Sequence, residues 1–267
     1  MTGMKARPIE MIPLIARRKS EPFDFVVELT AMLDKSGASL RNGDVLVVSG
    51  KFLAMAEGRY VDLGRTVPLH DAVAAGSRFK MSPALAETVI READHVLKGL
   101  HGFMLTIKEG AFAPNAGVDK SNIPKGKAIL HPSDPNRQAA LIRREVLLAF
   151  GAQVGVVVTD SRLQPLRRGT VGVTIGFSGI DAVVDDRGRE DLFGNRLKVT
   201  RRAVADDLSS AAQLLMGESD ETVPIVVVRG KDLPLADLDG YDVSVDPDEC
   251  IFVRGLANYG RTPSQAT

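Results

Sequence analysis

The sequence has little of several features that mark particular classes of protein. Of its 267 residues, one is a cysteine, Cys250, and none is a tryptophan. A single cysteine excludes an internal disulfide, which fits a reducing compartment. No apolar run approaches the ~18 residues of a membrane span. Residues 1–10 lack the apolar segment of a signal peptide. We therefore expect a cytoplasmic protein that does not contact a membrane.

The sequence also has no excess of charge of either sign. Lys+Arg and Asp+Glu both number 34, so the formal net charge at pH 7 is zero. Without a strongly basic field, the composition gives no support to nucleic-acid binding. The Gly-x-x-x-x-Gly-Lys-Ser/Thr spacing of a P-loop is absent as well. What is there, 44% hydrophobic and 25% charged residues, is the composition of an ordinary globular protein.

Patterns of apolar residues predict both strands and helices. Apolar runs predict strands at residues 11–15, 45–48, 154–158 and 225–228. Helical spacing predicts helices over residues 20–36, 83–94, 135–150 and 199–216. Because strands and helices alternate only loosely, we predict an α/β fold with an irregular mixed sheet and flanking helices. The polar segment 231–267 is punctuated by Pro and Gly, and we expect irregular structure there.

The polar stretch Pro114-Asn115-Ala116-Gly117-Val118-Asp119-Lys120-Ser121-Asn122 follows an apolar run and consists largely of turn-forming residues. Asp119 and Asn122, three residues apart, can direct a carboxylate and an amide at one ligand. That pair suits a hard cation beside a phosphate. The alternative is a polar turn whose side chains only satisfy the backbone, and the stretch alone leaves both open.

Two more acids have a similar setting. Asp160 follows a run of valines, and a carboxylate at the carboxyl end of a strand faces the crevice where α/β sheets bind ligands. Glu218 follows a predicted helix, at the end where the helix dipole favours a cation. With Asp119 and phosphate oxygens, these acids predict an Mg²⁺ or Mn²⁺ site. Basic residues that can take phosphate charge are Lys51, Arg167 and Arg168. Metal-bridged phosphates indicate phosphoryl transfer, whereas the alternative is three solvated acids.

Nine short motifs, in order along the chain, resemble those of the coenzyme F420-0:L-glutamate ligase family, the gamma-glutamyl ligases of deazaflavin biosynthesis. They are Ile12-Pro13-Leu14-Ile15, Gly43-Asp44-Val45-Leu46-Val47-Val48, Ala56-Glu57-Gly58-Arg59, Asn115-Ala116-Gly117-Val118-Asp119 with Ser121-Asn122, Val154-Gly155-Val156 to Thr159-Asp160, Arg167-Arg168-Gly169, Val204-Ala205-Asp206, Met216-Gly217-Glu218 and Val226-Val227-Val228-Arg229-Gly230. The resemblance implies a fold of the family's own, neither P-loop nor ATP-grasp, and a homodimer. We expect residues 1–230 to form one ligase unit or two interleaved subdomains, and residues 231–267 a C-terminal extension.

The resemblance also implies a reaction. GTP phosphorylates the terminal carboxylate of coenzyme F420-0, and the amine of L-glutamate attacks the acyl phosphate to form an amide. Asp119 and Asp160 match ligands of one divalent ion, Mg²⁺ or Mn²⁺, and Ser161 and Glu218 match ligands of a second. The positions that match GTP contacts are Ile12, Pro13, Leu14, Ile15, Gly50, Lys51, Asn122, Met216, Gly217 and Glu218. No residue is assigned as a catalytic acid or base.

The chain departs from the family pattern at several places: Pro114 stands where a small residue is usual, Ser161 stands where the family usually has a threonine, and two further departures remove a basic residue. Ala54-Met55 stands where the family commonly has Ser-Lys, so a lysine near the phosphates is missing, and we hypothesise that Lys51 partly substitutes for it. Gln164 stands where the family has an arginine. These departures leave two alternatives open: a paralogue that binds nucleotide without turnover, and a ligase that acts on another acid acceptor.

Overall fold

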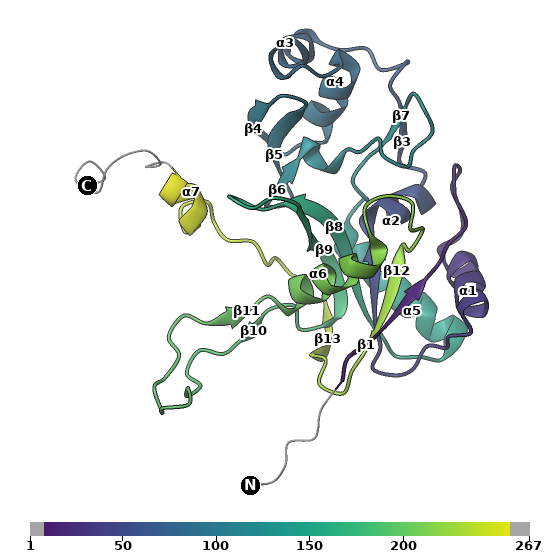
Figure 1. Ribbon diagram of the computed structural model, residues 1–267, viewed down its shortest axis with the longest axis vertical. Helices are drawn as coiled ribbons and strands as arrows, with labels where there is room; N and C mark the ends of the chain where they lie inside the picture. Colours follow the sequence, from purple (N-terminus) through teal and green to yellow (C-terminus); the bar gives the residue numbers. More distant parts are fainter. Residues whose placement is uncertain (1–7, 257–267) are drawn as a thin grey trace.

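A six-stranded mixed sheet lies at the centre of the fold (Figure 1). The computed structural model describes residues 8–256, so what was expected of residues 1–7 and 257–267 lies outside the described residues. In spatial order the strands are β1 (Glu10–Leu14), β12 (Ile225–Arg229), β2 (Val45–Ser49), β8 (Gly155–Leu163), β9 (Thr170–Ile180) and β13 (Leu235–Asp239). The β2–β8 pair is parallel and the other neighbours are antiparallel. The predicted irregular mixed sheet with flanking helices is confirmed.

Helices cover both faces of this sheet. Alternate residues of a strand point to opposite faces, so Leu46 and Val48 enter one core, whereas Val45 and Val47 enter the other. The first core is completed by α1 (Phe25–Ser36) and α5 (Pro135–Phe150), and the second by α6 (Val204–Met216). Burial on both faces explains why the central strands are continuous apolar runs in the sequence.

A second lobe, at the top of Figure 1, has an apolar core of its own. Its elements are α3 (His70–Phe79), α4 (Pro83–Glu92), the three-stranded sheet of β4 (His95–Leu100), β5 (Phe103–Lys108) and β6 (Ala111–Pro114), and the 3₁₀ turn η1 (Asn115–Gly117). The pair β3 (Tyr60–Asp62) and β7 (Lys127–Ile129) lies beside this lobe in Figure 1, and the helix α2 (Gly50–Ala56) lies below the pair, next to the main sheet. Whether the two lobes are separate subdomains stays a prediction.

Two peripheral elements extend from the body in Figure 1. One is the arm, residues 184–202, which begins with β10 (Val184–Asp185) and ends with β11 (Arg201–Arg202). The other is the short helix α7 (Ile251–Leu256). Within residues 8–256, no helix combines the length and the apolar character needed to cross a membrane.

A buried ion pair holds together two segments that are far apart in the sequence. Asp44, 1% exposed, accepts hydrogen bonds of 2.8 Å each from Nε and a terminal nitrogen of Arg229. A buried carboxylate requires such a partner, because an unpaired charge is costly to desolvate. The Gly-Asp and Arg-Gly motifs at the ends of β2 and β12 therefore have a structural role.

The structure corrects several boundaries and one larger expectation. The first helix begins at Phe25 instead of residue 20, because Asp24 is the N-cap and accepts a hydrogen bond from the Val27 amide. The helix predicted over 199–216 begins at Val204. Irregular structure throughout 231–256 is wrong, because β13 pairs with β9 and α7 follows. Tyr241 also packs edge-on against Phe177, with 5.0 Å between ring centroids.

Candidate functional site

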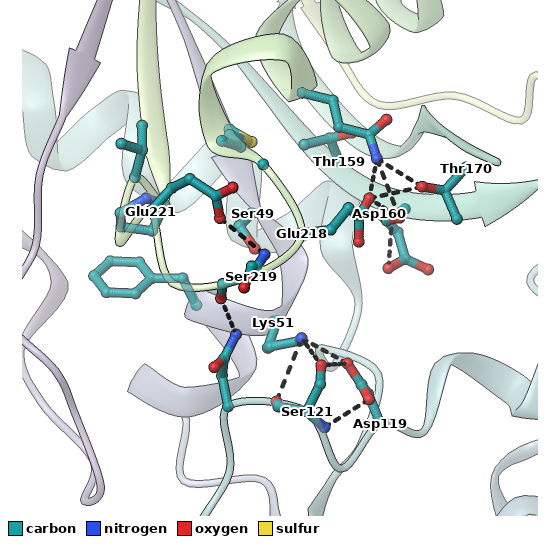
Figure 2. Close-up of a pocket in the computed structure, with 18 of the residues that line it drawn as sticks. Ser49, Lys51, Asp119, Ser121, Thr159, Asp160, Thr170, Glu218, Ser219 and Glu221 are labelled. Atoms are coloured by element: carbon teal, nitrogen blue, oxygen red, sulfur yellow. Dashed lines mark hydrogen bonds and ion pairs between the residues drawn. The ribbon is translucent and has the colours of Figure 1, made fainter.

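A pocket with a volume of about 760 Å³ opens where several segments meet (Figure 2). They include the residues after β1, the β2–α2 junction, the η1 turn with the residues after it, the second half of β8, the start of β9, and the connection from α6 to β12. The parallel pairing of β2 with β8 sets Ser49 opposite Thr159, so the start of α2 lies beside Asp160. This volume is in the range of small-molecule sites, ~300–1,000 Å³.

The pocket brings together most of the predicted site residues. Those that line it are Lys51, Asp119, Asn122, Asp160, Ser161, Met216, Gly217 and Glu218. Figure 2 shows Lys51, Asp119 and Ser121 facing one another in one group, and Asp160, Glu218 and Thr170 in another. Residues that are distant in the sequence therefore meet at one cavity.

Five of the predicted GTP contacts do not line the pocket. Ile12, Pro13 and Leu14 belong to β1, and Leu14 is fully buried in the core below it. The lining begins after Ile15, with Ala16, Arg17, Arg18 and Lys19. Gly50 is buried, and a Cβ there would lie 2.9 Å from Ile175. Arg167 and Arg168, proposed to take phosphate charge, also lie outside the lining. These assignments stay predictions without geometric support.

A strained turn fixes the position of Asp119. Asn115, Ala116 and Gly117 have φ values of 54°, 53° and 74°, and such values are unusual for alanine. The amide of Met104 donates to Oδ1 of Asn115, and the amide of Ala116 donates to Oγ1 of Thr106, both at 2.9 Å. Further along, Asp119 exchanges two backbone hydrogen bonds with Ile129. Such strain persists where the surroundings over-determine the backbone, so the carboxylate is held on a rigid base.

Both oxygens of Asp119 accept hydrogen bonds from the protein. Oδ2 lies 2.5 Å from Lys51 Nζ and 2.6 Å from Ser121 Oγ. Oδ1 accepts from the amides of Lys120 and Ser121 at 2.6 and 2.8 Å. Burial by itself raises the pKa of Asp119, but the Lys51 ammonium and the hydrogen bonds outweigh burial and hold the pKa below its ordinary value. Asp119 is therefore a paired carboxylate.

The second group is built on β8. The sequence predicted a strand that ends before Asp160, but β8 continues to Leu163 because the register with β9 shifts after Val158 and pairing resumes. Asp160 Oδ2 accepts from Nε of Arg162 at 3.1 Å, and this arginine is 4% exposed. The Ser161 hydroxyl donates to Oε1 of Glu218 at 2.5 Å. Asp160 therefore lies in a strand, not in the turn that the sequence predicted, and it lines the pocket together with Glu218 of the loop after α6.

Sequence reasoning missed several polar residues of this site. Thr170 Oγ1 donates to Oε1 of Glu218 at 2.8 Å, and Nε2 of Gln213 donates to the same oxygen. Gln213 is three residues before Met216 on α6, so a polar residue one turn from the Met-Gly-Glu motif was an available signal. No local pattern singles out Thr170, because its place at the pocket depends on β8–β9 pairing.

His131 supports the η1 turn from beneath. Its side chain is 2% exposed, and Nδ1 lies 3.2 Å from the Pro132 carbonyl oxygen. A Cβ on Gly117 would lie 2.9 Å from Cδ2 of this ring, so only glycine fits above it. Burial lowers the pKa of His131 to about 4, against an opposing attraction to Asp160. The ring is therefore neutral near pH 7 and packs as a structural group.

The oxygen donors of the pocket suit a hard cation, but they are few. Over residues 8–256, no three side chains of the His, Cys, Asp and Glu types converge so as to hold a metal ion unaided. Mg²⁺ is commonly held through one or two carboxylates together with substrate phosphates and water. Asp160 and Glu218, with the Ser161 hydroxyl that donates to Glu218, line the same pocket and are donors of that kind.

Comparison with known proteins gives consistent matches. Residues 17–230 match the sequence model of a family described as F420-0:Gamma-glutamyl ligase. The coenzyme F420:L-glutamate ligase of Methanopyrus kandleri is 39% identical over 231 residues, which cover 86% of this chain and 89% of that protein. The proteins of the same name from Methanocaldococcus jannaschii and Halorubrum lacusprofundi are each 37% identical. The first match covers 80% of this chain and 86% of the M. jannaschii protein, and the second covers 85% of this chain and 90% of the H. lacusprofundi protein. The resemblance inferred from the nine motifs is confirmed.

Proposed function

Because this chain belongs to the F420-0:gamma-glutamyl ligase family, we propose that it joins L-glutamate to coenzyme F420-0 in a GTP-dependent reaction. The γ-phosphoryl group of GTP passes to the terminal carboxylate of coenzyme F420-0, which releases GDP and leaves an acyl phosphate. The amine of L-glutamate attacks the acyl carbon, loses a proton and displaces phosphate, so an amide forms. The observation that carries the proposal is the pocket that gathers Lys51, Asp119, Asp160 and Glu218.

The nucleotide phosphates lie among the polar groups of this pocket. Lys51, Arg17 and Arg18 line it and can balance the charge of a triphosphate. Nδ2 of the Asn122 side chain donates to the carbonyl oxygen of Ser219 at 2.6 Å, so the loop after η1 and the loop after α6 are tied together. Positioning and charge neutralisation account for most of the catalysis of phosphoryl transfer, and a wall of two linked loops supplies the positioning.

A divalent ion, Mg²⁺ or Mn²⁺, is held by Asp160, Ser161 and Glu218. These residues fit such an ion because they present carboxylate and hydroxyl oxygens. In addition, the side chains that donate hydrogen bonds to Glu218 within the described residues are all uncharged. When bound, the ion neutralises charge on the phosphates. Arg162 positions Asp160 by donating to one of its oxygens, while the other oxygen accepts the Ser161 amide and no further donor among residues 8–256.

The chain forms a homodimer through its arm. The exposed fractions of Leu192 and Phe193, at the end of the arm, are 100% and 90%. Ion pairs between Arg187 and Asp185 and between Arg202 and Asp186 hold the base of the arm in shape. Apolar side chains carried away from the body in this way are typical of surfaces that meet a partner.

The first test is a mass-spectrometric assay of the purified protein with coenzyme F420-0, L-glutamate, GTP and Mg²⁺ or Mn²⁺, beside Asp160→Asn. We expect glutamylated product from the wild type and at least a hundredfold less from the variant, since a lost charge-stabilising group commonly costs ~10²–10³ in rate. Tight GTP binding without product contradicts the ligase and indicates a nucleotide-binding paralogue. If GDP is released in a glutamate-dependent reaction with a different carboxylic acid but not with coenzyme F420-0, the protein is a ligase for another acceptor.

A further inference from the structure

Lys51 lies at the start of α2 and reaches across the pocket to the loop after η1. Its ammonium is 2.5 Å from Oδ2 of Asp119, 2.8 Å from the Ser121 hydroxyl and 3.5 Å from the Ser121 carbonyl oxygen. The Lys51 side chain is 30% exposed, and that of Asp119 is 41% exposed (Figure 2). The pair therefore forms part of the pocket surface, within reach of a ligand.

The contacts of Asp119 leave little room for a divalent ion. Four donors, two on each oxygen, are supplied by Lys51, Ser121 and the Lys120 amide. A metal ion binds a carboxylate through the oxygen lone pairs that these donors use. An ammonium and a divalent ion on one oxygen also repel each other strongly at such short range.

The group around Glu218 is different. All three side chains that donate to this carboxylate, Ser161, Thr170 and Gln213, are uncharged and meet one oxygen, Oε1. Within the described residues, no positively charged side chain is bonded to the Glu218 carboxylate, so a cation that approaches Oε2 is not repelled by one. Asp160 lies between these two cases, because one of its oxygens is paired with Arg162 at 3.1 Å and the other accepts the Ser161 amide. Of the three acids, Asp119 is thus the one with two donors on each oxygen, one of them an ammonium, whereas Asp160 and Glu218 each keep an oxygen with at most one donor among the described residues.

We propose that Lys51 takes the place of one of two divalent cations in this site. Its ammonium neutralises Asp119 and presents a fixed positive charge to the phosphates, and the chain binds a single divalent ion at Asp160, Ser161 and Glu218. This inference rests on the proposed function, because the bound nucleotide completes the shell of that ion. It assigns Lys51 as a residue that sets the metal stoichiometry.

Manganese binding with a non-hydrolysable GTP analogue tests the inference, with free Mn²⁺ followed by electron paramagnetic resonance. We expect one Mn²⁺ per chain for the wild type and two for Lys51→Ser. The matched control is Lys120→Ser, which removes the same charge next to Asp119 but keeps the amide that donates to Oδ1. This control should bind one ion, like the wild type.

Two ions on the wild type overturn the inference and leave the proposed ligase intact. One ion on a folded Lys51→Ser, with thermal unfolding like that of the wild type, overturns it as well. A result of no Mn²⁺ on any of the three proteins, with the analogue bound, contradicts the metal dependence of the proposed function and the inference together. Two ions on both lysine variants show a general effect of charge and overturn the specific role of Lys51.

Discussion

At the scale of single residues, burial decides which ionisable groups carry charge. His131 is shielded by the η1 turn, and its pKa lies at about 4, whereas the reference value is 6.5. Asp119 is also partly buried, but the ammonium of Lys51 keeps its pKa low. The same physical cost, desolvation, therefore leaves the histidine neutral and obliges the carboxylate to take a cationic partner.

His131 should make stability depend on pH between neutrality and pH 5. The unfolded chain binds a proton near pH 6.5 and the folded protein does not until about pH 4, so stability is complete above pH 6.5 and falls as pH drops through this window. The limit is about 1.4 kcal/mol per pH unit for one group. The contribution of Asp119, whose pKa is lowered, is lost only at more acidic pH.

Urea unfolding at pH 7 and pH 5 measures this dependence. His131→Phe should show a smaller loss of unfolding free energy between the two pH values than the wild type, even if it is less stable at both. His101→Phe is the control, because that ring is exposed in the folded protein. Equal pH dependence in wild type and His131→Phe is the result that contradicts the argument.

At the scale of elements, two glycines of β9 let the backbones of two helices pack directly against the backbone of the sheet. A Cβ on Gly172 of β9 would lie 2.3 Å from the carbonyl oxygen of Ser209 in α6, and one on Gly176 would lie 2.4 Å from the backbone of Pro135 in α5. The contacts are backbone atoms, so they cannot move aside as a flexible side chain can. Helix α6 carries Gln213 and leads to Glu218, and its distance from β9 thus sets one wall of the pocket.

Gly172→Ala should displace α6 and weaken both stability and nucleotide binding. Overpacking of this kind typically costs about 1–3 kcal/mol, and we expect a several-fold loss of GTP affinity because Glu218 moves with the helix. Gly255→Ala in α7 is the control, since nothing lies within 4 Å of a Cβ there. Urea unfolding and nucleotide titration measure the two effects. If Gly172→Ala has the unfolding free energy and GTP affinity of the wild type, helix α6 can shift without cost and the prediction is wrong.

At the scale of the whole molecule, the homodimer stays a prediction, and the exposed Leu192 and Phe193 of the arm give it a test. Phe193→Asp should shift the protein from dimer to monomer in sedimentation or light-scattering measurements, because a charge cannot be buried there without a partner. Leu148→Asp, at a 77% exposed position on α5, is the control and should leave the dimer unchanged. A monomeric wild type contradicts the homodimer, and a dimeric Phe193→Asp places its interface elsewhere.

The sequence by itself determined the buried strands, the mixed α/β class and the family. Runs such as residues 45–48 and 225–228 have no polar side to expose, so burial on both faces follows from composition alone. The order of nine motifs indicated the family, and the places of Asp160 and Glu218 after apolar elements made these acids candidates for a site. Such features are local, and local patterns determine period and burial.

Only the tertiary structure decided which segments meet. The parallel pairing of β2 with β8, the addition of β13 to the sheet and the contacts of Thr170 and Gln213 with Glu218 depend on partners far away in the chain. The same is true of Lys51, which the sequence presented as a lysine after a strand and the fold pairs with Asp119. Pairing of this kind is selected by packing among competing segments, and a single stretch of sequence carries no record of its partner.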